Sequence, residues 1–538
     1  MEWSGVKAAV RLVLAHGLFA LVLAAAVAVR RLAMLGYPSV LWFGDSRTYL
    51  QGAIVLEPSY LRPSGYSIFL WLLRPAHSFT VVLTVQHAIG IALGVLVYAV
   101  VWRAARAAWP KRIWLPGLVA TPFAAAVLLD GHLLHLGHML MSDLLFTFWV
   151  TAAVAVVLWR RRMGWWTGAL AGLLVSFAAL TRSVGLPLLA VVLVCMAVRR
   201  AGWRAMTAAT AACVLPVLGY MTWFHSVYGK FAMTGTDQIF LYGRTVDFAD
   251  CSKLELPPEA RLMCRDHLEP HPQIAPAYRA LWGVDSPFEQ IVGGMYNPVA
   301  NELAGEFART AIREQPGDYL RVILRDTFRA FEWERKPYPT PWTAGSYEFR
   351  EGASLRRADA ELAYIYGGHT GVARVVEPYA GRIRDYQDTV YVRGPILGGM
   401  LLIGLVGMVV RIRRLGDPVL LPWAVGTALL VVPAATADFD YRYVLPALPF
   451  AAMAAGLALV PRPRRAESPA AESASPGREA KSPGRPGERP ETEPDGPGEA
   501  AGPGGPAEPD EPDEPGDPGE PGERPGAGPG ERAVAAAG

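Results

Sequence analysis

Charge is scarce in this 538-residue chain. Only 18% of its residues are charged, whereas soluble globular proteins average about 25%. Hydrophobic residues make up 52% and the mean hydropathy is +0.23, which argues against an ordinary soluble protein. Lysine is also rare, supplying six of the 51 basic residues, and there are only four cysteines. The arginine bias, together with abundant alanine, glycine and proline, is typical of a high-GC bacterial genome.

The last 77 residues, 462–538, differ from the rest in composition. They hold 17 of the 45 prolines, 17 acidic residues and nine basic residues, which gives a net charge of −8 and leaves the preceding 461 residues at +11. So little apolar surface is present that burial cannot offset the entropy of ordering the chain. We therefore predict a disordered tail rich in Pro, Gly and Glu that solubilises or tethers the protein and has no chemistry of its own.

The body contains runs long enough to span a bilayer, which takes about 20 apolar residues. Ten such runs lie at residues 8–29, 79–102, 114–131, 142–159, 164–180, 184–198, 205–223, 392–410, 418–434 and 444–460. Only Thr181-Arg182-Ser183 separates the fifth run from the sixth, and the central arginine favours a helical hairpin over one long span. The sequence predicts an all-α polytopic membrane protein with about ten transmembrane helices.

Basic clusters orient these helices, because cytoplasmic loops carry an excess of Lys and Arg. With the N-terminus in the cytoplasm, five basic clusters fall on the cytoplasmic side, at 103–112, 160–162, 199–204, 411–414 and 462–465. Arg30 and Arg31 are the main exception. Both termini are then cytoplasmic, in a multi-pass protein of the cell membrane. The first helix also resembles a signal peptide, but its longer apolar run favours a retained anchor.

This topology divides the chain into four parts. Residues 1–224 hold seven helices and a first outer loop at 30–78, residues 225–390 form an extracytoplasmic mixed domain, residues 391–461 hold three helices, and 462–538 is the tail. Apolar spacings of three and four predict helices over 297–331, divided at Pro316-Gly317. Cys251 and Cys264 lie 13 positions apart in the outer domain, and either form a disulfide or remain free thiols.

Two features of the outer face stand out. The apolar segment 64–73 lies between Arg62-Pro63 and Arg74-Pro75 and is too short to cross, which favours an interfacial or re-entrant helix. Several ionisable residues also gather at helix ends on this side, where burying charge is expensive and marks functional candidates. They are Asp45, Asp143, Arg182, Asp438, Asp440 and Arg442. For any one of them the alternative is an interfacial anchor or a helix cap, and Asp143 in particular is placed to cap a helix.

The order of these motifs resembles that of the GT-C membrane glycosyltransferases, in particular the protein O-mannosyltransferase and lipid A aminoarabinose transferase group. The resemblance covers about residues 8–240 and 392–460. It rests on Asp45, Arg62-Pro63-Ser64-Gly65-Tyr66, Ser142-Asp143, the run Leu180 to Leu186, and Arg442-Tyr443 followed by Pro446 and Pro449. Ser46 stands where many relatives have a second acid, and Arg62 and Ser64 replace a His and a Pro. These departures leave the acceptor class open.

The resemblance implies transfer of a sugar from a polyprenyl-phosphate donor to a hydroxyl of a glycan, lipid or protein at the extracytoplasmic face. Such transfer needs a base for the hydroxyl proton and cations for the departing phosphate. The resemblance implies that Asp45, as the base, and Asp143 are the catalytic residues. It implies that Arg182 and Arg442 bind the donor phosphate. The implied substrate-lining residues are Arg62, Tyr66 and Tyr443. The cytoplasmic loops carry no Walker or Rossmann glycine motif, and we expect no nucleic-acid partner.

A metal site is a weaker alternative. His132, His135 and His138 recur every three residues and, with Asp143, suit a divalent ion. A strict three-residue step drifts around a helix, however, so we predict no metal site, and the cofactor requirement stays unknown. His87 is expected to be a satisfied polar group within a span, and Arg244 a surface or salt-bridge residue.

Two other function classes compete with the enzyme. A transporter or lipid flippase predicts charges at mid-membrane and inverted repeats, whereas here the ionisable residues crowd one face. A non-catalytic scaffold would leave Asp45, Arg182 and Arg442 without a purpose. A single substrate must touch all three, so they must lie close together if the enzyme hypothesis holds.

Overall fold

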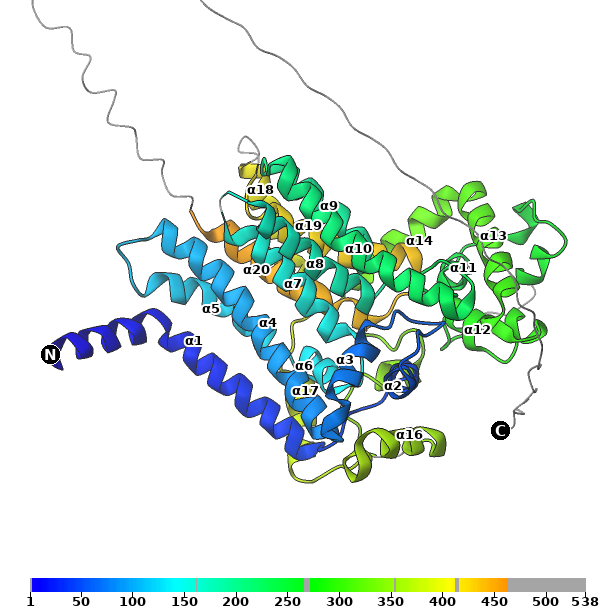
Figure 1. Ribbon diagram of the computed structural model, residues 1–538, viewed down its shortest axis with the longest axis horizontal. Coiled ribbons are helices and arrows are strands. Elements are labelled where there is room, and N and C mark those ends of the chain that lie inside the picture. The colour runs from blue at the N-terminus through cyan, green and yellow to red at the C-terminus, as the bar shows by residue number, and fades with distance from the viewer. Residues whose placement is uncertain (1, 161, 266–270, 353–354, 412–415, 462–538) are drawn as a thin grey trace, which may run out of the picture. The chain divides into compact units, whose positions relative to one another are not determined.

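The computed structural model describes residues 2–160, 162–265, 271–352, 355–411 and 416–461. Within these ranges the ordered elements are helices, with one isolated parallel bridge between Leu41 and Met139. The predicted all-helical class is therefore confirmed (Figure 1). The predicted tail at 462–538 lies outside the described residues, as do Arg161, Arg413 and Arg414 of the basic clusters.

Each of the ten predicted apolar runs is helical in the structure. The corresponding helices are α1 (Glu2–Gly36), α4 (Phe79–Ala108), α5 (Leu115–Leu128), α7 (Asp143–Trp159), α8 (Trp165–Thr181), α9 (Gly185–Val198), α10 (Trp203–Tyr228), α18 (Gly394–Val410), α19 (Leu420–Thr436) and α20 (Leu448–Leu459). By length and composition four described stretches suffice to cross a membrane, or six if two bent helix pairs each count as one span. The remaining four apolar helices, α7, α8, α9 and α19, have 10–17 residues.

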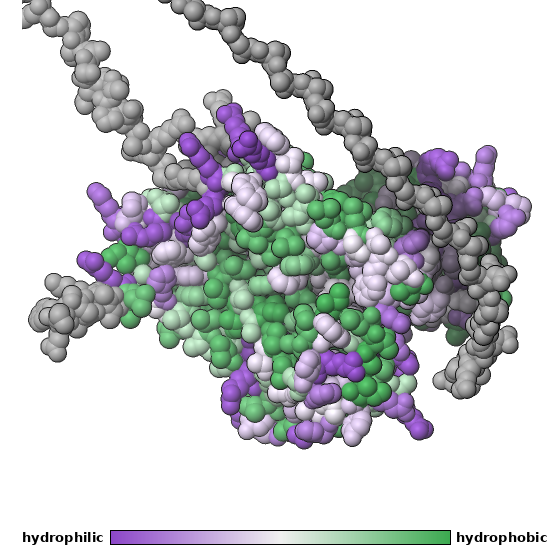
Figure 2. Space-filling view, in the orientation of Figure 1, coloured by the Kyte–Doolittle hydropathy of each residue, from purple (hydrophilic) through white to green (hydrophobic). Residues whose placement is uncertain are grey.

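The face of the bundle seen in Figure 2 is largely apolar over its middle. On α1 the side chains of Leu12, Val13 and Leu21 are exposed, and α18 likewise exposes Val409 and Val410. In water, contiguous apolar surface of this kind would mark an interaction site or cause aggregation, and in a bilayer it faces hydrocarbon. α20, by contrast, is almost entirely buried within the bundle. The protein is therefore a membrane protein built around a central C-terminal helix.

Small residues let two of the helices approach closely. Gly168 and Gly172 lie one turn apart on α8, and a Cβ on either would stand 2.0 Å from the carbonyl oxygen of Ala205 or Ala209 on α10. Such small-xxx-small faces are a common way to pack transmembrane helices, because the backbones can then touch. α7, α8 and α10 lie side by side in this part of the bundle (Figure 1).

Arg30, one of the two exceptions to the charge rule, is part of the bundle. It is buried near the end of α1 and donates hydrogen bonds to the carbonyl oxygens of Ala26, at 3.1 Å, and Leu128, at 2.8 Å. The guanidinium therefore joins α1 to the end of α5. Its position is explained by these contacts between helices.

Short helices connect the long ones at the end of the bundle that carries the ionisable residues. They are α2 (Ser46–Val55), α3 (Gly65–Leu73), η1 (Arg74–Ala76) and α6 (Gly131–His138). α3 coincides with the segment predicted as an interfacial or re-entrant helix, and its helical conformation is confirmed. It packs against α2 and α8.

Residues 225–390 fold into further short helices. These are α11 (Asp237–Thr245), η2 (Cys251–Lys253), η3 (Ala260–Met263), α12 (Pro276–Trp282), η4 (Pro287–Gln290), η5 (Gly294–Tyr296), α13 (Pro298–Glu314), α14 (Pro316–Arg329), α15 (Pro341–Gly345), α16 (Arg357–Gly367), η6 (Gly368–Gly371) and α17 (Tyr379–Thr389), and η7 (Tyr441–Tyr443) and η8 (Leu445–Ala447) precede α20. The predicted division of 297–331 at Pro316-Gly317 is confirmed, because α13 ends and α14 begins there. Since Met1–Arg465 form one compact unit, the domain boundaries at 224 and 390 stay a prediction.

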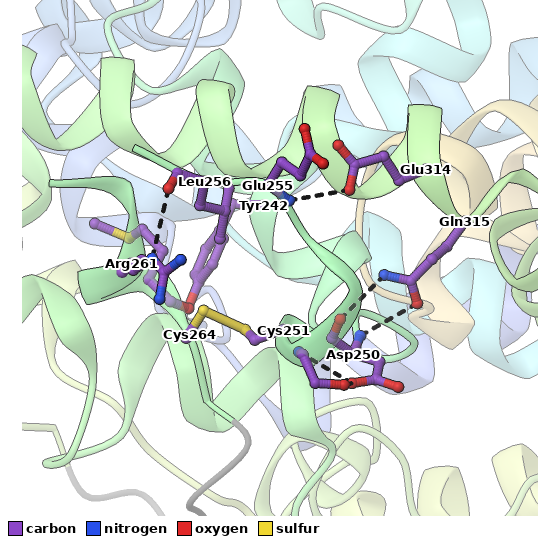
Figure 3. Close-up of a disulfide and its surroundings, with 11 residues drawn as sticks. Tyr242, Asp250, Cys251, Glu255, Leu256, Arg261, Cys264, Glu314 and Gln315 are labelled. Carbon is purple, nitrogen blue, oxygen red and sulfur yellow. Dashed lines mark hydrogen bonds between the residues drawn. A yellow bond between two sulfur atoms is a disulfide. The ribbon is translucent and has the colours of Figure 1, made fainter. Parts of the chain in front are cut away.

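Residues 225–390, called the outer segment below after their predicted position, have their own apolar core around α11 and α13, in which Ile239, Tyr242 and Phe307 are buried. Beside this core Cys251 and Cys264 form a disulfide, with their Cα atoms 6.0 Å apart (Figure 3). Tyr242 crosses the core and donates a hydrogen bond to the carbonyl of Met263, next to the second cysteine, at 2.9 Å. The disulfide thus ties the start of η2 to the residue that follows η3. The other two cysteines, Cys195 and Cys213, are free and buried in the helices.

Candidate active site

Asp45 is held at a corner between an extended segment and α2. Leu41 pairs with the chain before α7, donating to the carbonyl of His138 at 3.0 Å and accepting from the amide of Leu140 at 2.8 Å. Ser46 then fixes the turn: its hydroxyl accepts from the amide of Phe43 and donates to the carbonyl of Leu140, both at 2.9 Å. Ser46, which stands where many relatives have a second acid, therefore stabilises the turn. The backbone of Asp45 is held by the pairing of Leu41 on one side and by the hydrogen bonds of Ser46 on the other.

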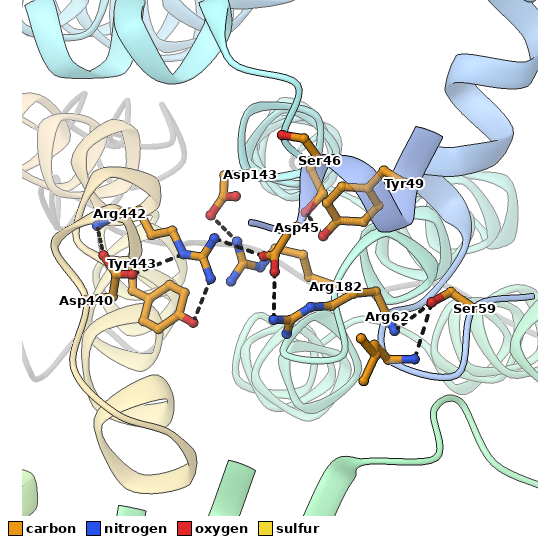
Figure 4. Close-up of polar contacts among 12 residues, drawn as sticks. Asp45, Ser46, Tyr49, Ser59, Arg62, Asp143, Arg182, Asp440, Arg442 and Tyr443 are labelled. Atoms are coloured by element: carbon orange, nitrogen blue, oxygen red, sulfur yellow. Dashed lines mark hydrogen bonds and ion pairs between the residues drawn. The ribbon is translucent and has the colours of Figure 1, made fainter. Parts of the chain in front are cut away.

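Each carboxylate oxygen of Asp45 contacts a different arginine (Figure 4). Arg62 Nη2 donates to Oδ1 at 2.9 Å, and Arg442 Nη1 donates to Oδ2 at 3.0 Å. The side chains of Asp45 and Arg62 are 16% and 21% exposed, so water reaches the cluster. The two cations come from the loop before α3 and from η7, so this contact joins the first and last parts of the helical body.

The arginines set the acidity of Asp45. Burial raises the pKa of its carboxyl, but the charges of Arg62 and Arg442 outweigh burial and hold that pKa well below its ordinary value. An opposite charge within a few ångströms favours the ionised form. In the ligand-free protein Asp45 is therefore an anion and, with so low a pKa, a weak base.

Arg442 is held by four neighbours. Beyond Asp45, its Nε lies 3.3 Å from Oδ2 of Asp440, its Nη2 donates to the hydroxyl of Tyr443 at 3.2 Å, and its guanidinium carbon lies 4.9 Å from the ring centre of Phe43. Asp440 in turn accepts a hydrogen bond from the hydroxyl of Tyr347 at 2.6 Å. These contacts fix the plane of the guanidinium, which leaves it oriented toward Asp45.

A second acid–arginine pair lies beside the first. Asp143, fully buried as the first residue of α7, pairs through Oδ1 with Arg182 from the end of α8. The N-cap of α7 is Ser142, with no capping bond from its side chain. Asp143 Oδ2 is buried and has no hydrogen-bond partner among the residues that the structure describes. Since the carboxylate of Asp143 contacts an arginine from another helix, helix capping does not account for it.

Tyr443 connects the two pairs. The guanidinium carbons of Arg182 and Arg442 lie 5.0 Å and 5.1 Å from the centre of its ring. Asp45, Asp143, Arg182 and Arg442, predicted from four different loops, therefore meet within the reach of one substrate, as Figure 4 shows. This proximity is what the enzyme hypothesis required and a scaffold would not need.

Gly65 explains how the loop that carries Arg62 reaches the site. A Cβ at this position would stand 2.6 Å from both the carbonyl carbon and the oxygen of Leu180, closer than real Cβ atoms approach. Glycine therefore lets the backbone of the loop lie directly against the backbone that leads into Arg182. Two of the motifs, Arg62–Tyr66 and Leu180–Leu186, are adjacent in space for this reason.

Tyr66 has its polar partner outside the cluster around Asp45. It is fully buried and donates a hydrogen bond to Gln86 Oε1 at 2.5 Å. The amide of Gln86 donates in turn to the carbonyls of Gly137 and Met139 at 2.9 Å. The hydroxyl of Tyr66 thus helps to position α3, α4 and the chain before α7. Its predicted contact with substrate stays a prediction.

Two of the three histidines of α6 have hydrogen-bond partners, and these partners differ. His132 Nδ1 lies 3.2 Å from Nε2 of Gln387, and His138 contacts His87 at 3.0 Å and the carbonyl of Tyr37 at 2.8 Å. His135 Nε2 is buried and has no partner among the described side chains and backbone groups. As expected, His87 is a satisfied polar group within its helix.

One group of acids is spaced as metal ligands would be. Oxygen atoms of Asp247, Asp326 and Asp438 lie within 4.8 Å of one another. Arg244 already supplies positive charge there, because it is fully buried and pairs with Asp247 and with Asp326, the latter at 2.6 Å. Arg244 is thus an internal salt-bridge residue. Asp438 accepts a hydrogen bond from the hydroxyl of Tyr338 at 2.8 Å and belongs to this cluster instead of the one around Asp45.

The comparisons with known proteins give little at the level of sequence: no family model matches the chain, and no curated protein does. Two solved structures match, both of ArnT from Cupriavidus metallidurans, one bound to undecaprenyl phosphate and one in the apo state. They share 15% and 14% identity, cover 82% of this chain and 77% and 76% of theirs, and have TM-scores of 0.28 and 0.30. ArnT is a lipid A aminoarabinose transferase. ArnT belongs to the enzyme group whose motif order this sequence resembles.

Proposed function

We propose that this protein is a membrane glycosyltransferase that moves a sugar from a polyprenyl-phosphate donor to an acceptor hydroxyl on the extracytoplasmic side. The observation that carries the proposal is the pairing of Asp45 with both Arg62 and Arg442, beside the pair of Asp143 and Arg182. This arrangement offers an acid–base group and several cations at one partly exposed point where membrane helices end. We further propose ten membrane spans, with both termini in the cytoplasm.

The arginines are the proposed ligands of the donor phosphate. A guanidinium presents paired donors to phosphate oxygens and keeps its charge when buried. Arg442 and Arg182 flank the Tyr443 ring, so a phosphate near that ring would contact both. In the reaction the bond between the anomeric carbon and the phosphate oxygen breaks, and the electron pair leaves with the polyprenyl phosphate. The cations stabilise that developing charge.

Asp45 is the proposed base. It takes the proton of the acceptor hydroxyl while the acceptor oxygen forms its bond to the anomeric carbon. In the ligand-free protein its pKa is too low for efficient proton abstraction, because burial is outweighed by Arg62 and Arg442. A donor phosphate that takes over the hydrogen bonds of Arg442 would remove one of these cations from Asp45. Its pKa would then rise, so that the base becomes effective only when donor is bound.

Asp143 is proposed to position Arg182 and, through its free oxygen Oδ2, to orient the acceptor. Arg62 and Tyr443 are proposed to line the substrate, since each has a polar group in the cluster.

Reconstituted full-length protein, supplied with a panel of radiolabelled polyprenyl-phosphate sugars and cell-envelope glycan, lipid and protein acceptors, tests the function. We expect transfer from at least one lipid donor, and Arg182→Gln and Arg442→Gln to reduce it. Transfer from a nucleotide sugar without any lipid donor would contradict the proposal. Donor movement across the bilayer without transfer would instead identify a flippase, the main alternative.

A further inference from the structure

One helix of the outer segment, α14, carries an apolar stripe that points away from the protein. Leu320, Leu324 and Phe328 follow one another at intervals of four residues and are 54%, 47% and 64% exposed. Since a helix turns by about 100° per residue, these three side chains lie within about 80° of one another around α14. The opposite face is buried through Val322 and Asp326. One face of α14 therefore packs on the protein, while an apolar face is directed outward.

The arginines of α14 border this stripe and are paired with acids of the same helix. Arg325 and Arg329 pair with Asp326 at 2.9 Å and 3.5 Å. Arg321 pairs with Asp318 at 2.5 Å. A helix with large apolar side chains on one face and arginines on the neighbouring face is typical of helices that lie in the interface of a bilayer. The composition of α14 therefore suits a lipid surface.

Contacts with α19 place α14 at the level of the outer end of that helix. The hydroxyl of Tyr319 donates a hydrogen bond to the carbonyl of Ala435, the residue before the end of α19, at 2.8 Å. Further along α14, Ala330 lines a small cavity together with Leu429 of α19. Leu429 precedes the end of α19 by about two turns, or roughly 10 Å along the axis. α14 thus lies beside the part of α19 that enters the membrane from the side of the catalytic cluster.

Contacts with α18 give the same level. A Cβ on Gly394, the first residue of α18, would stand 2.3 Å from the carbonyl oxygen of Glu332, so the chain that follows α14 lies directly against the start of α18. The exposed ring of Trp333 has its centre 5.0 Å from the guanidinium carbon of Arg393, and tryptophan is enriched at the membrane–water interface. From Ile396 onward the exposed large side chains of α18 are apolar. The stripe on α14 therefore lies at the level where the bilayer-facing surface of α18 begins.

We propose that Leu320, Leu324 and Phe328 lie in the bilayer and contact the acyl chains of its extracytoplasmic leaflet, in the topology proposed above. α14 is then an interfacial helix and not part of a domain surrounded by water. Lipid is the occupant because the stripe stands beside two helices, α18 and α19, at the level where their own apolar surfaces meet hydrocarbon. The bilayer-facing surface of the protein is thereby extended from the spans into the outer segment.

The proposed depth of α14 brings the reaction centre close to the lipid headgroups. Asp326 and Ala330, on the inner face of α14, line one small cavity together with Tyr443, and Arg182 and Arg442 flank the Tyr443 ring. Since a helix with its side chains is about 10–12 Å wide, about one helix diameter separates the stripe from this ring. A lipid-linked donor would present its phosphate to both arginines without leaving the membrane. This consequence rests on the proposed transferase function, whereas the depth of α14 does not.

Spin-label depth measurements test the proposal with the full-length protein in liposomes of phosphatidylcholine and phosphatidylglycerol. A nitroxide is attached at Leu324→Cys or at Phe328→Cys, both exposed positions at which the substitution removes little packing. Its collision rates with oxygen, which concentrates in hydrocarbon, and with a water-soluble nickel chelate give its depth. We expect both labels about 5–10 Å below the lipid phosphates, as for other interfacial helices. Replacement of the free thiols Cys195 and Cys213 by alanine restricts the label to one site, because the other two cysteines form the disulfide.

Two matched positions calibrate the measurement. A label at Arg357→Cys on α16, where the side chain is 94% exposed, should lie in water, and one at Leu402→Cys on α18, an exposed apolar position, should lie deeper than the stripe. Access of nickel to Leu324→Cys and Phe328→Cys equal to that at Arg357→Cys would place the stripe in water and overturn the proposal. Low access of both reagents would show that protein, such as a second copy of the chain, covers the stripe, and would overturn it equally. No donor or acceptor is present, so the result is independent of whether the protein transfers sugar.

Discussion

Arg442 donates a hydrogen bond from Nη1 to Oδ2 of Asp45 at 3.0 Å, across 397 positions of the chain. Arg62 occupies the other oxygen of the same carboxylate at 2.9 Å. The proposed base is therefore neutralised from both sides before any substrate arrives. In the proposed mechanism donor phosphate and Asp45 compete for the guanidinium of Arg442, and this competition gives the site several measurable properties.

The pH dependence should differ between the free and the donor-bound enzyme. In the free enzyme burial raises the pKa of Asp45, but Arg62 and Arg442 lower it by more than burial raises it, so the pKa lies below its ordinary value. The ionised form is the active one, so the acid limb of kcat/KM should lie below the usual range of an aspartate, about pH 4. Bound phosphate weakens the effect of the arginines, so the acid limb of kcat should lie about 1–3 pH units higher. Identical acid limbs would contradict the exchange of ion pairs.

Stability must be followed in the same experiment. A carboxylate whose pKa is lowered by folding contributes stability above its unfolded pKa, and this contribution is lost as the pH falls through the folded value. Asp45 is such a group. Activity that recovers when the pH is returned to 7 distinguishes protonation of the base from unfolding.

Replacement of Arg442 should act mainly on the donor. Loss of a charge-assisted contact costs about 1.5–3 kcal/mol, so Arg442→Gln should weaken donor binding about 10- to 150-fold. Arg442→Lys keeps the charge but loses the fork that contacts Asp45 and Tyr443 together, so it should recover only part of the affinity. Equilibrium binding of a fluorescent polyprenyl-phosphate sugar measures both. Arg321→Gln, an exposed arginine on α14, serves as the control, and equal donor affinity in all four proteins would remove Arg442 from the donor site.

Gly65 should tolerate no side chain. Gly65→Ala places a Cβ 2.6 Å from the carbonyl of Leu180, and such overpacking typically costs 1–3 kcal/mol. The loop must shift and take Arg62 away from Asp45, so transfer should fall more than stability. Gly44→Ala is a close control, because nothing lies within 4 Å of a Cβ there, although the residue precedes Asp45. The transfer rates and melting temperatures of the two variants test this prediction. Equal activity of the two variants would show that the close approach of Gly65 to Leu180 is not needed for transfer.

The disulfide should stabilise the outer segment only. A bridge between residues 13 positions apart removes chain entropy worth about 3 kcal/mol from the unfolded state. The double variant Cys251→Ser and Cys264→Ser should therefore lose hydrogen-exchange protection in α11 and α13, whereas α8 and α10 keep theirs. Cys195→Ala, in which a free buried thiol is replaced, should leave exchange in α11 unchanged. Equal protection with and without the disulfide would mean that the apolar core around Tyr242 holds this region by itself.

The helical body could be predicted from the sequence because its signal is local. Hydrocarbon thickness demands long apolar runs, and all ten predicted runs are helices in the structure. Their number as membrane spans stays a prediction, since α7, α8, α9 and α19 have no more than 17 residues each. The convergence of Asp45, Arg182 and Arg442 could also be anticipated, because the alternation of loops places helix ends on a common side.

Contacts that depend on long-range packing could not be predicted. Tyr347 bonds to Asp440 from the outer segment, where no motif marks it, and Phe43 contacts Arg442 only because of the turn fixed by Ser46. Asp438 and Asp440 are two positions apart, yet they join different clusters, since Asp438 accepts a hydrogen bond from Tyr338 and Asp440 accepts one from Tyr347. The buried position of Arg244 likewise follows from three acids that come together only in the folded chain.

The central claim is that Asp45 removes the proton of the acceptor once donor phosphate has taken over the hydrogen bonds of Arg442. The most direct test is a single-turnover measurement of sugar transfer with donor bound at saturation, comparing the wild type with Asp45→Asn. Loss of a general base typically costs 10²–10⁴-fold in rate, and donor binding should survive because Arg442 and Arg182 remain. We predict a rate at least about 100-fold lower in Asp45→Asn with donor affinity equal to or higher than that of the wild type. A variant that binds donor normally and transfers sugar at the wild-type rate would contradict the claim.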